Sequence, residues 1–293
     1  MQKCKRHPST TTTTSSSPAS PLSELRRLLT SRDERERTGR FFADGLRPVV
    51  QALNSPGTRI EQVVLAPELL KNSLGENLRE RLRAQRIPET TLSASLYRQL
   101  SNLEEPQGIG VIVQRRPQRL SWLSPTDGEF FVALDTIHAP GNLGTILRTM
   151  DAVGASGLIL IGGEIDPFDP RVVRATMGSL FAQKIVRTTA PEFAAWRTQH
   201  GVVLVGTSPH ATTSYRAFDW PQRTVLWLGG EREGLSQTQQ AACDTVVRIP
   251  IVGTCDSLNV ATAAAVLLYE VKHFHDSSQP HSGLPRPSHP LGV

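Results

Sequence analysis

Five polar side chains in the second half of the chain occupy three short segments, and their types suit the binding of an anionic ligand. Asn142 and Arg148 belong to the first segment, Glu231 to the second, and Ser257 and Asn259 to the third. A guanidinium binds a phosphate through paired hydrogen bonds and stabilises negative charge on a nearby oxygen. Taken singly, each segment is equally well explained by a capped helix or a glycine turn, so only their joint arrangement can indicate chemistry.

The first and third segments each join an expected strand to an expected helix. Asn142 follows a strand over 130–135 and is expected to cap a helix over 143–153, with Arg148 about one and a half turns further on. In the third segment a strand stops at Pro250, a loop follows, and Ser257 is expected to cap a long alanine-rich helix over 258–273.

The second segment is rich in glycine and follows a strand expected over 224–229. Gly229, Gly230 and Gly234 let a ligand approach the backbone and leave N–H groups free. A dinucleotide-dependent oxidoreductase is one alternative, but it requires a G-x-G-x-x-G turn after its first strand. Only Gly141 and Gly144 stand at that place here, which disfavours this class.

Short apolar runs alternate with amphipathic segments over residues 129–275, which predicts an α/β fold with a mostly parallel sheet covered on both faces. Strands are expected over 130–135, 157–161, 202–206, 224–229 and 246–249, and helices over 143–153, 171–180, 191–200, 237–242 and 258–273. Ligands of such sheets bind beyond the carboxyl ends of the strands. All three segments lie at such ends.

The first half of the chain predicts a smaller α/β domain over 21–116, followed by a proline-containing linker over 117–128. Leu46, Val49 and Val50 share one helical face there, and strands are expected over 60–66 and 108–114. Residues 1–20 and 276–293 are of low complexity and are expected to be disordered tails.

Charge is distributed unevenly along the chain. Residues 24–125 contain 17 Arg and Lys against 12 Asp and Glu, whereas residues 126–293 contain 12 against 15. A basic surface favours a polyanionic partner.

Composition narrows the cellular setting. The three cysteines, Cys4, Cys243 and Cys255, fit neither a zinc pattern nor a disulfide framework, so we expect no metal and a reducing compartment, the cytoplasm. No apolar run approaches the roughly 20 residues of a membrane helix, so no membrane association is expected.

Together, the three segments resemble the SpoU (TrmH-like) family of the SPOUT methyltransferases. That family shows Asn-x-Gly-x-x-x-Arg, then Gly-x-Glu-x-x-Gly-Leu, then Ile-Pro followed by Ser-Leu-Asn-Val. The matching residues stand here in the same order: Asn142, Gly144 and Arg148; Gly229, Glu231, Gly234 and Leu235; Ile249, Pro250, Ser257, Leu258, Asn259 and Val260. Ala261 departs from the pattern, because a serine is usual there.

The resemblance implies methylation of a ribose 2′-hydroxyl in rRNA or tRNA with S-adenosylmethionine as the donor. It also implies a trefoil-knotted C-terminal domain, a homodimer and a front domain that is ribosomal-protein-like and binds RNA. The expected catalytic residues are Arg148, Asn142, Glu231, Ser257 and Asn259, and the expected cofactor contacts are Gly229, Gly230, Gly234, Ile249, Leu258, Gly206 and Thr207. An RNA-binding protein that has lost catalysis is the second alternative, but it predicts a damaged first or third segment, and both are intact.

Overall fold

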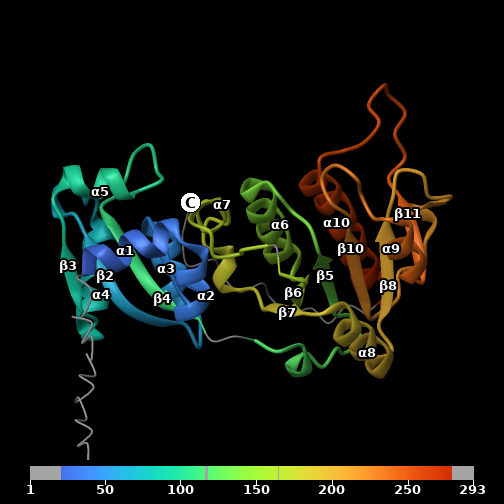
Figure 1. Cartoon of the computed structure of the whole chain (residues 1–293), viewed down its shortest axis with the longest axis horizontal. Coiled ribbons are helices and arrows are strands. Elements are labelled where there is room, and N and C mark those ends of the chain that lie inside the picture. Colours follow the sequence, from blue (N-terminus) through green and yellow to red (C-terminus); the bar gives the residue numbers. More distant parts are fainter. Residues whose placement is uncertain (1–20, 116–117, 164, 279–293) are drawn as a thin grey trace, which may run out of the picture.

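The computed structural model describes residues 21–115, 118–163 and 165–278. Within these residues the chain forms two lobes side by side, each built on one sheet (Figure 1). The tail expected over 1–20, and residues 279–293 of the tail expected over 276–293, lie outside the described residues.

The N-terminal lobe contains a four-stranded sheet in the order β1-β4-β2-β3, in which β4 is antiparallel to both β1 and β2. Its strands are β1 (Arg40–Asp44), β2 (Arg59–Leu65), β3 (Glu89–Thr91) and β4 (Ile109–Gln114). Its helices are α1 (Pro21–Thr30), α2 (Arg32–Thr38), α3 (Leu46–Asn54), α4 (Ser73–Ala84) and α5 (Ala94–Leu100). The helical face expected at Leu46, Val49 and Val50 is buried in α3.

The C-terminal lobe contains a seven-stranded sheet in the order β7-β6-β5-β10-β8-β11-β9, and all its strand pairs are parallel. Its strands are β5 (Phe130–Leu134), β6 (Gly157–Ile161), β7 (Ile185–Thr188), β8 (Val203–Thr207), β9 (Thr213–Ser214), β10 (Thr224–Leu228) and β11 (Thr245–Arg248). Its helices are α6 (Pro140–Val153), α7 (Pro170–Ala175), α8 (Ala190–His200), α9 (Gln237–Ala242) and α10 (Val260–Ser278). The predicted α/β class with a parallel sheet is confirmed.

The central strands are apolar at every position because their alternate residues pack into two different cores. Val132 of β5 packs into a core that includes α6 and α10, whereas Phe131 packs into a second core with Trp196 of α8. The sheet is therefore covered on both faces, and strand positions on either side are removed from water.

Three helix ends differ from the sequence-based expectations. Helix α6 begins at Pro140 with Ala139 as its N-cap, so Asn142 lies inside the first turn and does not cap. Proline suits the first helical position because its missing N–H would have no partner there. Helix α10 begins at Val260, and its cap is Asn259 and not Ser257: Asn259 Oδ1 accepts from the Ala261 and Thr262 N–H groups at 2.9 and 3.3 Å.

The helix expected over 171–180 stops at Ala175, because Met177 and Gly178 adopt φ angles of 52° and 98°. A 3₁₀ turn, η3 (Ser179–Phe181), follows. At the other end of the lobe, α10 continues to Ser278, beyond the expected start of the tail at 276. Burial of His275, whose ring nitrogens bond the Gly128 and Pro221 carbonyl oxygens, holds this last turn.

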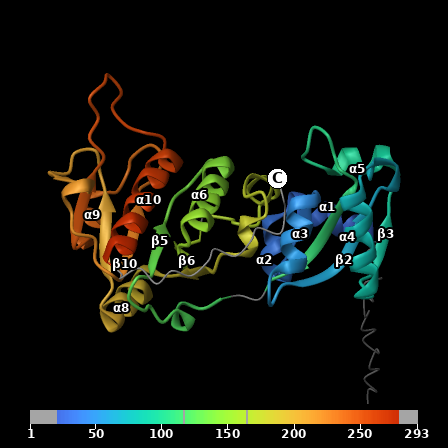
Figure 2. The same ribbon diagram turned by 180° about the vertical axis from the view of Figure 1, so that it is seen from behind.

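The linker expected over 117–128 packs against the C-terminal lobe. It contains a 3₁₀ turn, η2 (Leu120–Trp122), and buries Leu120 and Leu123 in the core beside α8. Trp196 Nε1 donates to the Leu123 carbonyl at 2.9 Å. Both views show residues 118–128 running along the lower side of the C-terminal lobe, next to α8 (Figure 1 and Figure 2).

Candidate active site

A cavity of about 370 Å³ lies beyond the carboxyl ends of β8, β10 and β11, where sequence analysis placed the ligand. Ligand pockets of proteins usually measure about 300–1,000 Å³, so a small cofactor fits. Its walls are formed by the segments that follow these strands and by the start of α10. The apolar lining residues are Leu228, Leu235, Val247, Ile249, Ile251, Leu258, Val260, Ala263 and Leu267.

The glycine segment after β10 folds back on itself to form one wall. Gly230 and Gly234 exchange two backbone hydrogen bonds of 3.1 and 3.0 Å, and Gly234 has a φ of 65°. A Cβ at Gly229 would lie 2.2 Å from the Gly234 carbonyl carbon, a distance that no side chain tolerates. Gly229 therefore permits the tight turn that exposes this backbone to the cavity.

A chain of side-chain hydrogen bonds joins the three sequence segments. Glu231 accepts from Asn142 Nδ2 at 2.5 Å and from the backbone N–H of Ala139 at 3.1 Å, at the start of α6. Asn142 Oδ1 in turn accepts from Asn259 Nδ2 at 3.1 Å. Asn259 also caps α10, so one network fixes the N-termini of two helices and the glycine turn relative to each other.

Arg148 and Ser257 lie outside this network. Both are exposed, and neither side chain makes a hydrogen bond or an ion pair with another residue in the described part of the chain. Ser257 lines the cavity, whereas Arg148 does not. Glu231 binds Asn142 and Ala139, and not Arg148.

The expected cofactor contacts line the cavity with one exception. Six do so: Gly229, Gly230, Gly234, Ile249, Leu258 and Thr207. Gly206 faces away from it, because a Cβ there would lie 2.7 Å from Cys243 Sγ and 3.0 Å from Leu235 Cδ1. Gly206 thus permits the close packing of α9 and the glycine segment on β8.

Six polar residues that sequence analysis did not single out also line the cavity: Ser208, His210, Arg232, Glu233, Gln240 and Asp256. Ser208 and His210 follow β8 directly, so the rule that ligands bind beyond strand ends could have found them. Gln240 belongs to α9 and donates from Nε2 to the Leu235 carbonyl at 2.7 Å. Nothing in its local sequence signals this contact.

No metal cluster is evident among the described residues, and Cys243 is not a reactive thiol. No group of three His, Cys, Asp or Glu side chains gathers there. Burial raises the pKa of the Cys243 thiol to about 11, so this thiol is protonated near neutrality. No helix in residues 21–278, outside the gaps already given, is long and apolar enough to cross a membrane.

Two family models match the chain and together cover both lobes. The SpoU rRNA methylase family matches residues 129–269, and an MRM3-like substrate-binding domain matches residues 23–110. The first match contains the cavity and all three segments, and the second corresponds to the N-terminal lobe.

Named relatives and solved structures agree with these matches. A 23S rRNA (uridine(2479)-2′-O)-methyltransferase of Streptomyces viridochromogenes is 35% identical over 250 residues, which are 83% of this chain and 86% of that one. The structure of the SpoU methyltransferase AviRb from the same species, in complex with AdoMet, superposes with a TM-score of 0.79 at 32% identity and covers 89% of this chain and all of that one. The AdoMet-bound rRNA methyltransferase of Sinorhizobium meliloti gives 0.77 at 35% identity, over 86% and 94% of the two chains. The chain therefore belongs to the SpoU rRNA methylase family.

Proposed function

We propose that the protein transfers a methyl group from S-adenosylmethionine to a ribose 2′-hydroxyl of large-subunit ribosomal RNA. The observation that carries this proposal is the Glu231–Asn142–Asn259 network, which joins all three family segments beside one cavity. The intact segments disfavour an RNA-binding protein without catalysis. The relatives named for 23S rRNA favour ribosomal RNA over transfer RNA.

The cavity fits the cofactor in chemistry as well as size. Its apolar walls suit an adenine ring, and the free backbone groups of the Gly229–Leu235 turn and the 249–258 loop suit the ribose and the amino-acid end. Bound S-adenosylmethionine supplies an electrophilic methyl group on a sulfonium. Ile249, Leu258 and Gly229 would hold it by backbone contacts, with Thr207 at the edge.

Arg148 is proposed to bind the target nucleotide and to stabilise negative charge on the attacking oxygen. Its guanidinium is exposed and has no bond within the described residues, so it is available to RNA. Arginine stays protonated over the accessible pH range, so a different group accepts the proton of the 2′-hydroxyl. Ser257 is likewise exposed at the cavity and is proposed to hydrogen-bond the nucleotide.

We propose a positioning role for Asn142, Glu231 and Asn259. Each uses its polar atoms within the network, and two of the three support helix N-termini. They fix the loops that surround S-adenosylmethionine and the RNA. A site that is already in place before the reaction lowers the activation free energy.

The homodimer and the trefoil knot remain predictions from the family resemblance. Exposed apolar side chains support the dimer: Val252 and Leu258 on the loop before α10, and Tyr269 on α10 itself, are 100%, 36% and 58% exposed. Sedimentation of the full chain should give twice the 32.1 kDa monomer mass. Tyr269→Lys should shift the protein towards monomer, whereas Trp122→Lys, at an exposed tryptophan of η2, should not.

Two measurements test the function. Calorimetry should show S-adenosylmethionine binding in the micromolar range, about −8 kcal/mol, with no binding of NAD. Purified protein should then transfer labelled methyl groups to large-subunit rRNA from a strain that lacks the gene, and mass mapping should place the label on one ribose. Tight NAD binding, or label on a base, would overturn the proposal.

A further inference from the structure

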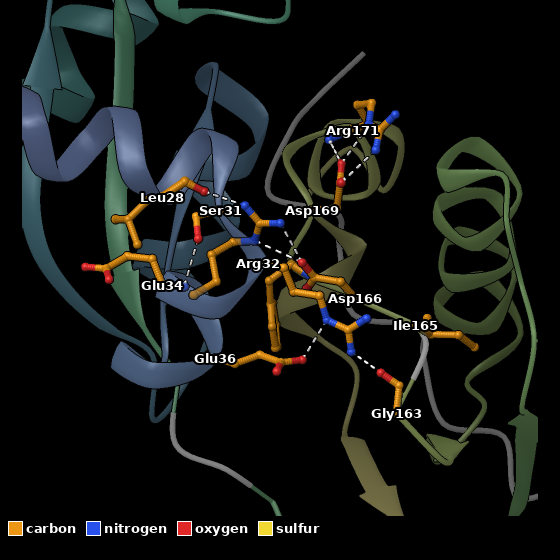
Figure 3. Close-up of polar contacts among 12 residues, drawn as sticks. Leu28, Ser31, Arg32, Glu34, Glu36, Gly163, Ile165, Asp166, Asp169 and Arg171 are labelled. Carbon is orange, nitrogen blue, oxygen red and sulfur yellow. Dashed lines mark hydrogen bonds and ion pairs between the residues drawn. The ribbon is translucent and has the colours of Figure 1, made fainter.

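A buried ion pair joins the two lobes. Arg35 of α2 is 5% exposed and donates from Nε and Nη2 to Asp166 Oδ2 at 2.9 and 2.6 Å, while its Nη1 donates to the Leu28 carbonyl at 2.6 Å. Asp166 lies in the loop between β6 and α7 and is 11% exposed in its side chain. Its second oxygen accepts from the Phe168 N–H at 2.9 Å, so the carboxylate is fixed from both sides. Figure 3 shows Leu28 of the N-terminal lobe and Asp166 of the other lobe on opposite sides of this contact.

Further contacts surround this pair and make the joint rigid. The ring of Phe41 from β1 stacks on that of Phe168 with centroids 4.9 Å apart. Arg32 donates to the Gly163 carbonyl, a bond that Figure 3 also shows, and Arg115, after β4, donates to the Leu180 carbonyl at 3.3 Å. Contacts from α2, β1 and the end of β4 thus hold the same region of the second lobe.

A short path of packed elements leads from the ion pair to the active site. Three residues after Asp166, Asp169 caps α7 by accepting from the Arg171 N–H at 2.8 Å. Helix α7 ends at Ala175, which packs so closely on α6 that a Cβ at Gly144 would lie 2.3 Å from Ala175 Cβ. Helix α6 carries Asn142 and Arg148. A rotation of the N-terminal lobe about this joint would therefore move the RNA-binding surface relative to Arg148.

We propose that Arg35 and Asp166 are positioning residues that select the methylated nucleotide. A buried ion pair adds little stability over an apolar pair of equal size, but its bidentate bonds define one orientation. By holding that orientation, the pair keeps a fixed distance between the RNA element bound by the N-terminal lobe and the ribose presented to Arg148. The substrate is then a folded rRNA segment in which these two features have that spacing. This inference rests on the proposed function.

The test compares the full-length wild type with Arg35→Met/Asp166→Leu, which removes both charges together, and with Arg35→Lys, which keeps the charge but not the paired bonds. Arg37→Ala is the matched control, because Arg37 is on the same helix in an exposed pair with Glu34. Distances between the lobes are measured by spin labels on cysteines placed at exposed Gln99 and Thr198, in a background without the native cysteines. Kinetics use large-subunit rRNA, and calorimetry measures S-adenosylmethionine binding.

The double variant should fold and keep its cofactor affinity. Its distance distribution should broaden, its KM for rRNA should rise about tenfold with a smaller change in kcat, and methylation should spread to neighbouring nucleotides. Arg35→Lys should show the same changes to a lesser degree, and Arg37→Ala none. An unchanged distance distribution in both variants overturns the proposal, as does a broadened one with unchanged KM and methylation pattern. If the wild type itself methylates no rRNA, the proposed function fails instead, and the distance measurement still tests the joint.

Discussion

Arg148 is the one expected catalytic side chain that is exposed away from the cavity and makes no bond within the described residues. It lies one helical turn after Gly144, the residue at which α6 packs against Ala175 of α7. An arginine that only stabilised the fold would bury its stem or pair with an acid, as Arg35 does with Asp166. Arg148 does neither, so its charge remains available to the RNA.

Replacement of Arg148 should therefore affect rate and leave the fold intact. Arg148→Ala should lower single-turnover methyl transfer about a hundredfold or more, because a charge-stabilising donor is removed. Arg148→Lys should rescue poorly, since a point charge lacks the planar fork. Melting temperature and S-adenosylmethionine affinity should match the wild type, and Arg119→Ala, at another exposed arginine, serves as control. A near-normal rate in Arg148→Ala would remove this residue from the mechanism.

The two described cysteines should differ sharply in reactivity. Cys255 is exposed in the loop before α10, whereas Cys243 is partly buried and burial raises its pKa to about 11. In a Cys4→Ser background at pH 8, an alkylating reagent should modify Cys255 at least about a hundredfold faster, since only the thiolate reacts and burial keeps the Cys243 thiol almost wholly protonated. Mass spectrometry of digested protein measures both rates.

The pH dependence of this difference follows from the same pKa. Modification of Cys243 should accelerate about tenfold per pH unit up to about 11. The folded state also binds the Cys243 proton more tightly than the unfolded state, so this thiol's contribution to stability falls as pH rises from about 8.5 to 11. Equal rates for the two cysteines in native protein would contradict the burial of Cys243.

At the scale of helices and strands, apolar runs were sufficient to predict most of the second sheet. Strand β6 (Gly157–Ile161) begins and ends at the predicted residues, because a strand buried on both faces is apolar at every position. Two strands gave no such signal. Strand β3 has only three residues, none of them apolar, and β7 has four, of which Arg187 is exposed. Their pairing partners, and not their own sequences, define them.

The helix caps show why the site was predicted only in part. Ser257 and Asn259 are both good capping residues two positions apart, and local preference does not decide between them. Asn259 is chosen in the structure because its amide also reaches Asn142, 117 residues earlier in the chain. Which residues gather at the cavity was predictable from strand ends; which of them bond to each other depends on such long-range contacts.

Two glycines of α6 give a matched test of how closely α6 and α7 pack. A Cβ at Gly144 would lie 2.3 Å from Ala175 Cβ, whereas a Cβ at Gly141 has nothing within 4 Å. Gly144→Ala should lower the free energy of unfolding by about 1–3 kcal/mol through overpacking. Gly141→Ala should raise it by up to about 1 kcal/mol, because alanine loses less backbone entropy in a helix. Urea denaturation monitored by circular dichroism distinguishes these outcomes, and a stabilised Gly144→Ala would show that α7 lies further away.

At the scale of the whole molecule, the linker expected over 117–128 suggested two independent domains, yet the lobes share buried contacts. Phe41 stacks on Phe168 and Phe181, and one core cluster contains residues of both lobes. These contacts join residues more than 120 positions apart, so no local pattern could reveal them.

The uneven charge of the chain predicts where RNA affinity originates. Four exposed arginines of the N-terminal lobe have neither an acidic partner nor a hydrogen bond from the guanidinium among the described residues: Arg26, Arg47, Arg86 and Arg98. Neutralising all four to glutamine should weaken rRNA binding and flatten its salt dependence, by roughly one unit of slope for each phosphate that is no longer neutralised. S-adenosylmethionine affinity should not change, since the cavity lies in the other lobe.

The control neutralises two arginines that already have acidic partners in the same lobe. Arg37 pairs with Glu34 and Arg83 with Glu89, so their charges are largely compensated and glutamine there should alter the slope much less. Filter binding between 50 and 200 mM salt, about the range over which phosphate contacts are most visible, measures each slope. If the fourfold variant keeps the wild-type slope, these arginines do not contact phosphates, and the RNA is held by the C-terminal lobe around Arg148.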